Sequence, residues 1–377
     1  MQQPALHARS PLSTAALFTP FTLGALTLRN RIVMAPMTRS FSPGGVPGDD
    51  VAAYYRRRAE HDVGLIVTEG TVIAHPASSA FPRAPHFFGD AALASWARVV
   101  AAVHAAGGRI MPQLWHVGMQ RTPGAEPNPD APPVGPSGIN MLGDTVNEPL
   151  ADADVAAIIE AYGQGAADAM RLGFDGIELH GAHGYLIDQF FWGRTNRRTD
   201  KYGGDLVART RFGAEVVRAC RRRTSPEFPI VLRFSQWKID AYDAKLVATP
   251  DELARFVGPL VDAGVDIFHC SQRQFWLPEF EGSGLNLAGW TKKVSGKPTI
   301  TVGSVGLDRE LMSSMGTGAV TAHAGLDRVV RMIEEGEVDL VAIGRALLAD
   351  YAWAEKIRDG RDSELLPFTP ESAQTLS

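Results

Sequence analysis

Two histidines and a tyrosine lie within six positions of the sequence, at His180, His183 and Tyr185. They begin where a short apolar run typical of a buried strand ends. Imidazoles three residues apart at a strand-to-helix turn offer two N–H donors to a single oxygen, such as that of an enolate. A tyrosine hydroxyl stays protonated at neutral pH and can donate a proton to a developing carbanion. The cluster therefore predicts chemistry at a carbonyl-activated carbon, with Tyr185 as the general acid.

Other roles fit the same three residues. His116 or Glu178 would complete a metal site with the two histidines, as in a hydrolytic barrel enzyme. The donor role is favoured because neither an H-x-H nor an H-E-x-x-H spacing is present. In a purely structural role, the histidines would be satisfied loop residues and Tyr185 would pack with its hydroxyl bonded. The two cysteines, Cys220 and Cys270, lack a paired metal spacing and are too few for a disulfide framework.

Two further polar residues end apolar runs, at Gln113 and Arg233. A glutamine amide presents one acceptor and two donors, which match the imide edge of a pyrimidine-like ring. An arginine places a fixed positive charge beside a ring that becomes anionic on reduction. Both residues fit equally well as hydrogen-bonding groups inside a barrel.

Glycine follows two apolar runs near the end of the chain, at Gly303 and Gly344, with Ser304 and Arg345 beside them. Loops after the last two strands of a barrel commonly bind phosphate through backbone N–H groups and a nearby helix N-terminus. A glycine at either position would also permit a tight turn. Glycine at both, with an arginine beside one, favours phosphate.

The apolar pattern predicts the elements that must position these residues. Short apolar runs alternate with longer amphipathic stretches, which is the pattern of parallel strands covered by helices. Strands are expected at residues 31–37, 64–69, 109–114, 176–180, 230–234, 266–270, 299–302 and 339–343. Helices are expected, among others, at residues 93–105, 155–171, 206–222, 252–263 and 326–335. Eight such units, without a G-x-G-x-x-G turn between strand and helix, predict an α/β fold, a single (β/α)8 TIM barrel.

The segment 116–149 is rich in Pro, Gly and Asn and has no helical period, which predicts a long loop after strand 3. On a barrel, this loop is a candidate lid or substrate rim. The expected domain organisation is a flexible N-terminal arm at 1–16, the barrel at 17–365 and a C-terminal tail at 366–377.

Composition excludes several classes of function. The 377 residues are 45% hydrophobic and 21% charged, which is typical of a globular protein. A net charge of −5 without a basic stripe argues against nucleic-acid binding. No apolar run approaches the roughly 20 residues that span a bilayer, and residues 1–14 lack the apolar stretch of a signal peptide. A cytoplasmic protein is expected, and the arm is free to pack on a partner subunit of a homo-oligomer.

These motifs resemble those of the Old Yellow Enzyme family of flavin-dependent ene-reductases over nearly the whole chain. The resemblance lies in residues 17–18, 30–39, 67–71, 113–116, the His180 cluster, 196–204, Arg233, Gly303 and 344–345. The segment 196–204, which reads Asn-Arg-Arg-Thr-Asp-Lys-Tyr-Gly-Gly, is especially specific.

The resemblance implies a non-covalent FMN across the top of the barrel. Thr38 would bond the flavin carbonyl edge, Arg233 would lie near N1 and O2, and Gln113 would lie along the pyrimidine side. The glycines and their neighbours near the end of the chain would surround the phosphate. The full cofactor-binding set that the resemblance implies is Ala35, Pro36, Met37, Thr38, Gly70, Gln113, His180, Arg233, Gly303, Ser304, Gly344 and Arg345.

The resemblance also implies a reaction. NADPH or NADH would reduce the flavin, and hydride would pass from flavin N5 to the β-carbon of an enone, nitroalkene, maleimide or quinone. His180 and His183 would hold the substrate oxygen while Tyr185 protonates the α-carbon. A flavin-binding protein that reduces enones only incidentally is a further alternative.

Some residues depart from the family pattern or have no counterpart in it. Thr38 stands where one branch of the family has cysteine, and no proline occurs near Asp350. The resemblance supplies no role for Phe275, Trp276 or Trp237, which leaves both lining of the substrate mouth and aromatic packing open.

Overall fold

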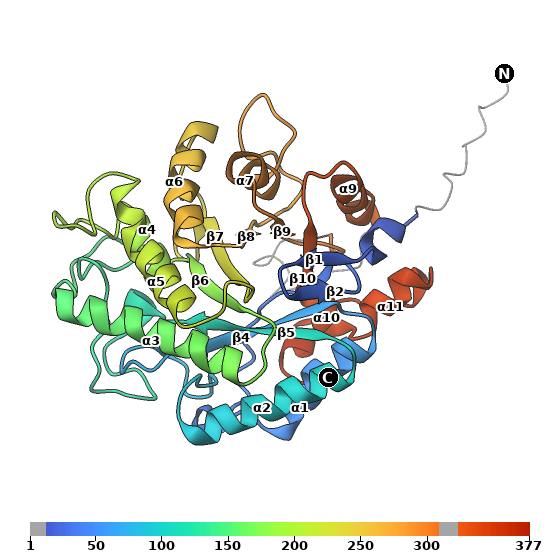
Figure 1. Cartoon of the computed structure of the whole chain (residues 1–377), viewed down its shortest axis with the longest axis horizontal. Coiled ribbons are helices and arrows are strands. Elements are labelled where there is room, and N and C mark those ends of the chain that lie inside the picture. The colour runs from blue at the N-terminus through green and yellow to red at the C-terminus, as the bar shows by residue number, and fades with distance from the viewer. Residues whose placement is uncertain (1–12, 309–322) are drawn as a thin grey trace.

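The computed structural model describes residues 13–308 and 323–377. Within these residues, eight parallel strands close into a barrel in the order β10-β3-β4-β5-β6-β7-β8-β9, with helices around it (Figure 1). The strands are β3 (Ile32–Met34), β4 (Leu65–Val72), β5 (Arg109–Trp115), β6 (Ile177–His183), β7 (Ile230–Lys238), β8 (Ile267–Ser271), β9 (Thr299–Val302) and β10 (Leu340–Ile343). The predicted eight-stranded barrel is confirmed.

The outer layer consists of helices that follow the strands. They are α1 (Asp49–Glu60), α2 (Asp90–Ala105), α3 (Asp152–Arg171), α4 (Leu186–Phe191), α5 (Arg211–Arg222), α6 (Pro250–Ala263), α7 (Leu287–Ser295), α9 (His323–Glu334), α10 (Arg345–Ala349) and α11 (Trp353–Arg358). α2, α3 and α6 begin two or three residues earlier than predicted. Their first turns contain Asp or Pro, which stabilise helix N-termini but do not contribute to an apolar period. Residues 208–210, predicted as helix, form a 3-10 turn before α5.

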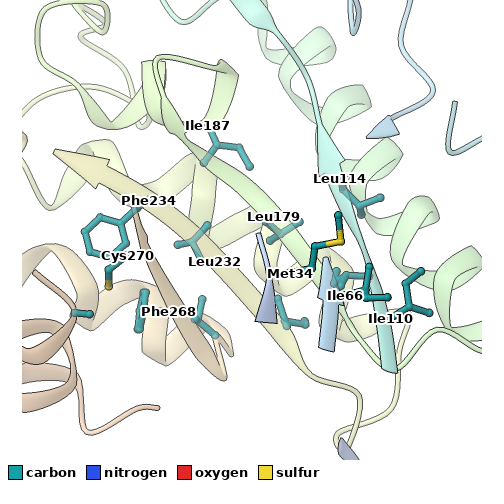
Figure 2. Packing of buried hydrophobic residues seen from close by; sticks show 14 of the residues in the cluster. Met34, Ile66, Ile110, Leu114, Leu179, Ile187, Leu232, Phe234, Phe268 and Cys270 are labelled. Carbon is teal, nitrogen blue, oxygen red and sulfur yellow. The ribbon is translucent and has the colours of Figure 1, made fainter. Parts of the chain in front are cut away.

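Alternate strand residues face the helices and form the larger core cluster. Figure 2 shows members of this cluster on neighbouring strands, including Ile110 and Leu114 of β5, Leu179 of β6, and Leu232 and Phe234 of β7. These side chains are fully buried or nearly so. Burial of this outward-facing apolar layer attaches the helices to the barrel.

The opposite strand faces fill the barrel interior, and an antiparallel hairpin covers that interior at the N-terminal end. The hairpin pairs β1 (Phe21–Leu23) with β2 (Leu26–Leu28). Three of its residues share a core cluster with the inward residues of the barrel: Phe21, Leu26 and Leu28 with Val33, Ala35, Leu65, Val67, Met111, Val231, Ile267, Ile300, Leu340 and Ala342. The sequence pattern did not predict this hairpin, because three-residue strands are too short to show a period.

Two segments outside the barrel strands bear on the site. Between β5 and α3, the described chain contains one helical element, the 3-10 turn Gly118–Gln120. The segment 366–377 lies against α1, where Arg57 and Arg58 donate to the carbonyl oxygens of Leu376 and Ser377 (Figure 1).

Of the arm predicted at 1–16, residues 1–12 lie outside the described residues, and Ala15–Phe18 forms a 3-10 turn. The division into arm, barrel and tail stays a prediction. None of the described helices combines the length and the apolar character needed to cross a membrane.

Candidate active site

One cavity of about 420 Å³ opens at the C-terminal ends of the barrel strands. Every site residue predicted from the sequence lines it: Ala35, Pro36, Met37, Thr38, Gly70, Gln113, His180, His183, Tyr185, Arg233, Gly303, Ser304, Gly344 and Arg345. The barrel thus brings together residues that are spread over three hundred positions of the chain. Their individual roles stay predictions.

The histidine cluster is carried by a strand that ends later than expected. β6 continues past His180 to His183, and β7 continues past its predicted end to Lys238, with which His183 is paired. An irregularity in the pairing follows Gly181, and His183 has a φ of 64°, in the left-handed region. The backbone N–H of His183 donates to Ser235 Oγ at 2.9 Å, which supports this unusual conformation.

The side chains of the cluster pack against one another at the top of the barrel. The rings of His180 and His183 are 5.2 Å apart at 86°, and the Tyr185 ring lies 4.8 Å from that of His180. Tyr185 also meets Trp115 edge to face at 5.0 Å. His183 stacks on Trp237 at 4.3 Å, so this tryptophan both lines the cavity and supports a histidine. The three predicted side chains therefore form one compact group.

Burial determines the protonation states of this group. It lowers the pKa of both His180 and His183 well below the usual range, and the charge of Arg233 adds to the effect. Burial raises the pKa of Tyr185 to about 12, and the negative charge of Asp240 acts in the same direction. At neutral pH both imidazoles are therefore neutral and the tyrosine hydroxyl keeps its proton.

Hydrogen bonds select the tautomers of the two imidazoles. His180 Nδ1 accepts from the N–H of Ala182 at 3.4 Å, so Nε2 is the nitrogen that carries the proton. His183 Nε2 lies 2.8 Å from Ser271 Oγ, which itself accepts from Arg233 Nη2 at 3.4 Å. With the Ser271 hydroxyl donating to His183 Nε2, His183 carries its proton on Nδ1. Each ring keeps one N–H donor.

A buried ion pair holds the turn that carries Tyr185. Lys238 Nζ lies 2.9 Å from Asp188 Oδ1, and both side chains are 0% exposed. The other oxygen of Asp188 accepts from the N–H of Gly184 at 2.7 Å. Gln189 Nε2 donates to the carbonyl of Gly184 at the same distance. These contacts give Lys238 a structural role that the sequence did not reveal, since its partner lies fifty residues away.

A polar layer lies beneath the cavity on neighbouring strands. Glu178 accepts from Gln113 Nε2 at 2.7 Å, and its second oxygen lies 2.6 Å from His269 Nδ1. Arg233, which pairs with His269 across β7 and β8, is also buried, and its Nε atom has no hydrogen-bond partner. From the sequence alone, Glu178 fitted a metal ligand and His269 had no predicted role, because the partners of both residues lie far away along the chain.

The residues proposed to complete a metal site are bound elsewhere. Glu178 is held by Gln113 and His269, and His116 Nε2 lies 2.9 Å from His75 Nδ1. Across the described residues, no three His, Cys, Asp or Glu side chains are grouped so that they could hold a metal ion. The arrangement therefore does not support the hydrolytic alternative.

The opposite side of the cavity is built from small residues and close backbone contacts. Gly303 has a φ of 145°, and a Cβ there would lie 2.5 Å from the carbonyl oxygen of Gln272. A Cβ at Gly70 would lie 2.6 Å from the Trp115 ring. Arg345 Nη2 donates to Ser304 Oγ at 3.0 Å, so the charge and hydroxyl predicted to bind phosphate lie together.

Segments from both ends of the chain complete the rim. The N–H groups of Arg39 and Ser40 each donate to Glu69 Oε2 at 2.8 Å, which holds the stretch that carries Thr38. Phe368 from the C-terminal segment also lines the cavity, although no local pattern marks it as a site residue. In contrast, Phe275 is fully buried and packs edge to face on Trp276 at 5.4 Å. Phe275 is therefore a packing residue.

Comparisons with known proteins agree with this architecture. Residues 16–364 match the NADH:flavin oxidoreductase / NADH oxidase family. The chain is 34% identical over 367 residues to 12-oxophytodienoate reductase 7 of Oryza sativa subsp. japonica, covering 91% of this chain and 88% of that protein. It is 35% identical over 360 residues to NADH oxidase of Thermoanaerobacter brockii, covering 93% of this chain and 52% of that protein.

Solved structures give the same result. Morphinone reductase aligns with 95% of this chain and 92% of its own, at 30% identity and a TM-score of 0.78. The structure of morphinone reductase in complex with tetrahydroNAD aligns with 95% of this chain and 93% of its own, at 31% identity and the same TM-score of 0.78. The Old Yellow Enzyme homologue from Zymomonas mobilis aligns with 96% of this chain and 97% of its own, at 25% identity and a TM-score of 0.77.

The cavity fits the FMN of this family, which takes electrons from a reduced nicotinamide. Gly70 and Gly303 line the cavity where a Cβ would clash with Trp115 or with the backbone of Gln272, and Arg233 Nε is a buried donor without a partner. Arg345 and Ser304 supply a cation and a hydroxyl for a phosphate. The chain therefore belongs to the NADH:flavin oxidoreductase / NADH oxidase family, which is the Old Yellow Enzyme family indicated by its motifs.

Proposed function

We propose that this protein reduces carbon–carbon double bonds that are activated by a carbonyl or a related group, at the expense of NADPH or NADH. The single observation that carries this proposal is the contact of the Tyr185 ring with His180, 4.8 Å apart, beside a second neutral imidazole. A protonated phenol next to two N–H donors suits a substrate that gains charge on oxygen and a proton on carbon.

When bound, FMN supplies the two-electron chemistry, taking a hydride from the nicotinamide and passing it through N5 to the substrate β-carbon. The protein side chains bind the substrate oxygen and supply the proton. His180 Nε2–H and His183 Nδ1–H hold the substrate oxygen and stabilise its developing negative charge. Tyr185 gives its hydroxyl proton to the α-carbon. Because one cavity serves both half-reactions, ping-pong kinetics are expected.

The cavity walls favour a flat, partly apolar substrate. Trp115, Trp237, Ile239 and Tyr242 line it, and they meet a planar ring through aromatic and aliphatic faces. Enones, nitroalkenes, maleimides and quinones are the substrate classes we propose. The names of relatives, 12-oxophytodienoate reductase and morphinone reductase, point to small organic substrates for those proteins.

The proposal is tested by the Tyr185→Phe variant in anaerobic half-reactions. Oxidation of the reduced flavin by cyclohexenone should slow by about 100-fold, the usual contribution of a general acid. Reduction of the flavin by NADPH should stay within about twofold of the parent, because that step needs no proton from Tyr185.

The matched control is Tyr242→Phe, which removes a hydroxyl from the same cavity but not from the histidine cluster. It should leave the oxidation rate within a few-fold of the parent. Equal oxidation rates for Tyr185→Phe and the parent would remove the general-acid role. They would favour a flavin-binding protein with incidental reductase activity.

The colour of the purified protein separates this proposal from the metal-dependent hydrolase. A yellow preparation that is bleached by NADPH in the absence of air supports the reductase, whereas a colourless one with stoichiometric zinc contradicts it. A cytoplasmic location and a homo-oligomeric state stay predictions.

A further inference from the structure

A buried carboxylate lies one side chain away from the cavity without lining it. Glu178 on β6 is 0% exposed, and its two oxygens take hydrogen bonds from two different strands, the adjacent β5 and the next-but-one β8. Gln113 of β5 contacts one oxygen and lines the cavity, whereas His269 of β8 contacts the other and is itself 0% exposed. A carboxylate is retained at such depth only when its partners offset the loss of solvation.

The first consequence concerns Gln113. An ionised carboxylate only accepts hydrogen bonds, so the amide must turn its Nε2 toward Glu178. Gln113 Oε1 and the second amide hydrogen are thereby left for the group in the cavity. Glu178 thus fixes which face of the amide a flavin ring would meet.

The second consequence concerns charge. Burial lowers the pKa of Arg233, and the negative charge of Glu178 is the largest influence that raises it. His269 is neutral at pH 7, because burial lowers its pKa by more than Glu178 raises it, so its Nδ1–H donates to Glu178. The buried layer then contains one negative and one positive charge, and Glu178 offsets Arg233 beneath the ring.

We propose that Glu178 is a positioning residue that sets the reduction potential of the bound flavin, by offsetting the charge of Arg233 and by orienting Gln113. A negative charge beneath the ring disfavours its electron-rich reduced form, which lowers the potential. The inference rests on the FMN cofactor but not on which substrate oxidises it, so it survives if the ene-reductase proposal fails.

The test is the potential of Glu178→Gln, which removes the charge and keeps the size of the side chain. The holoenzyme is reduced anaerobically in the presence of a reference dye, with no enone, and both absorbances are recorded. The equilibrium constant for two-electron reduction should rise about tenfold, which corresponds to a potential higher by about 30 mV. An unchanged or lower potential overturns the proposal.

Two further variants separate the effect of the lost charge on the potential from the effect of altering a buried side chain. Glu178→Asp keeps the charge and should stay closer to the parent potential than Glu178→Gln. Asp350→Asn removes a carboxylate that is also buried and paired, with Lys356 at 2.7 Å, but lies outside the cavity lining. It should leave the potential unchanged. Equal shifts in Glu178→Gln and Asp350→Asn would show a general effect of lost buried carboxylates and would overturn the proposal.

If Glu178→Gln does not fold, His269→Leu gives a second measurement. This change leaves one oxygen of Glu178 without a donor, so burial disfavours the ionised carboxylate. The potential should then rise as it does in Glu178→Gln. A potential equal to that of the parent when both are measured at the same pH overturns the proposal.

Discussion

The two halves of the barrel differ in the residues that face the interior. In one half, β5, β6, β7 and β8 contribute the buried polar residues Gln113, Glu178, Arg233 and His269. In the other half, the interior residues include small or medium apolar ones: Ala35, which follows β3, Val67 of β4, Val302 of β9 and Ala342 of β10. One half therefore supplies charge and hydrogen bonds, and the other supplies space.

This difference between the halves follows from the hydrogen-bond partners that buried polar residues require. Buried polar groups need partners, and β6 and β7, with 7 and 9 residues, continue far enough to provide them across the pairing. In the other half, β3, β9 and β10 have 3, 4 and 4 residues, whereas β4 has 8, and Gly303 and Gly344 follow β9 and β10 directly. The extended pairing of β6 with β7 supports the reactive groups, and the short strands β9 and β10 end at the glycines that line the cavity.

The largest expected effect is a loss of folding stability at acidic pH. It should be greatest in the half of the barrel formed by β5, β6, β7 and β8. His116 and His269 are fully buried, His180 is 5% exposed and His183 is partly buried, and each has a folded-state pKa below its ordinary value. Such groups lose stability as pH falls below the unfolded pKa of about 6.5, because the unfolded chain then binds more protons.

A histidine that stays neutral in the folded protein down to pH 5.5 contributes a loss of about 1.4 kcal/mol at that pH. Glu69 acts in the opposite direction, because burial raises its pKa to about 7. The histidines outnumber it, so the free energy of unfolding should fall between pH 7.5 and 5.5, as measured by urea unfolding. Hydrogen exchange should rise more in β6, β7 and β8 than in β3, β9 and β10, and a uniform rise would remove the contrast between the halves.

The next effect is loss of an oxygen-directed donor. His180→Ala should slow oxidation of the reduced flavin by cyclohexenone about 100-fold and weaken phenol binding, since one such donor contributes about 2.7 kcal/mol. The control is His104→Ala, whose ring pairs with Asp175 outside the cavity at 2.8 Å. If His180→Ala binds phenol as tightly as the parent, His180 does not hold the substrate oxygen.

The half of the barrel formed by β3, β4, β9 and β10 is tested by the Gly303→Ala variant. A Cβ at this position meets backbone at 2.5 Å, and the φ of 145° strains any other residue. FMN affinity should fall by at least about fivefold, because such strain costs about 1–3 kcal/mol. Gly284→Ala is the matched control, since no atom lies within 4 Å of its Cβ position. Affinities that fall equally in both variants would show no special role for Gly303.

The smallest effect is expected from Ser271→Ala, which removes the hydroxyl beside His183 Nε2 and Arg233 Nη2. Loss of a neutral hydrogen bond of about 1 kcal/mol should slow the oxidative half-reaction about fivefold. FMN binding should change little. A rate unchanged in stopped-flow measurements would show that His183 keeps its tautomer without Ser271.

The barrel and the residues around its cavity were largely predictable from the sequence. Inward and outward residues alternate along each strand, so a run such as 230–234 identifies both the strand and the position of Arg233. Motifs such as 113–116 and 196–204 then identified the family. Predicted strand ends were less accurate, because β6 and β7 are extended by pairing with each other.

Local sequence determined the order of strands and helices, the types of residue at the strand ends and the family of the protein. Tertiary structure alone decided three things: the hairpin that covers the barrel floor, the left-handed backbone of His183, and the contacts of Glu178 with Gln113 and His269. The physical reason is distance along the chain. Periodicity records which face of a strand is buried, but a partner 65 or 91 residues away leaves no local signal.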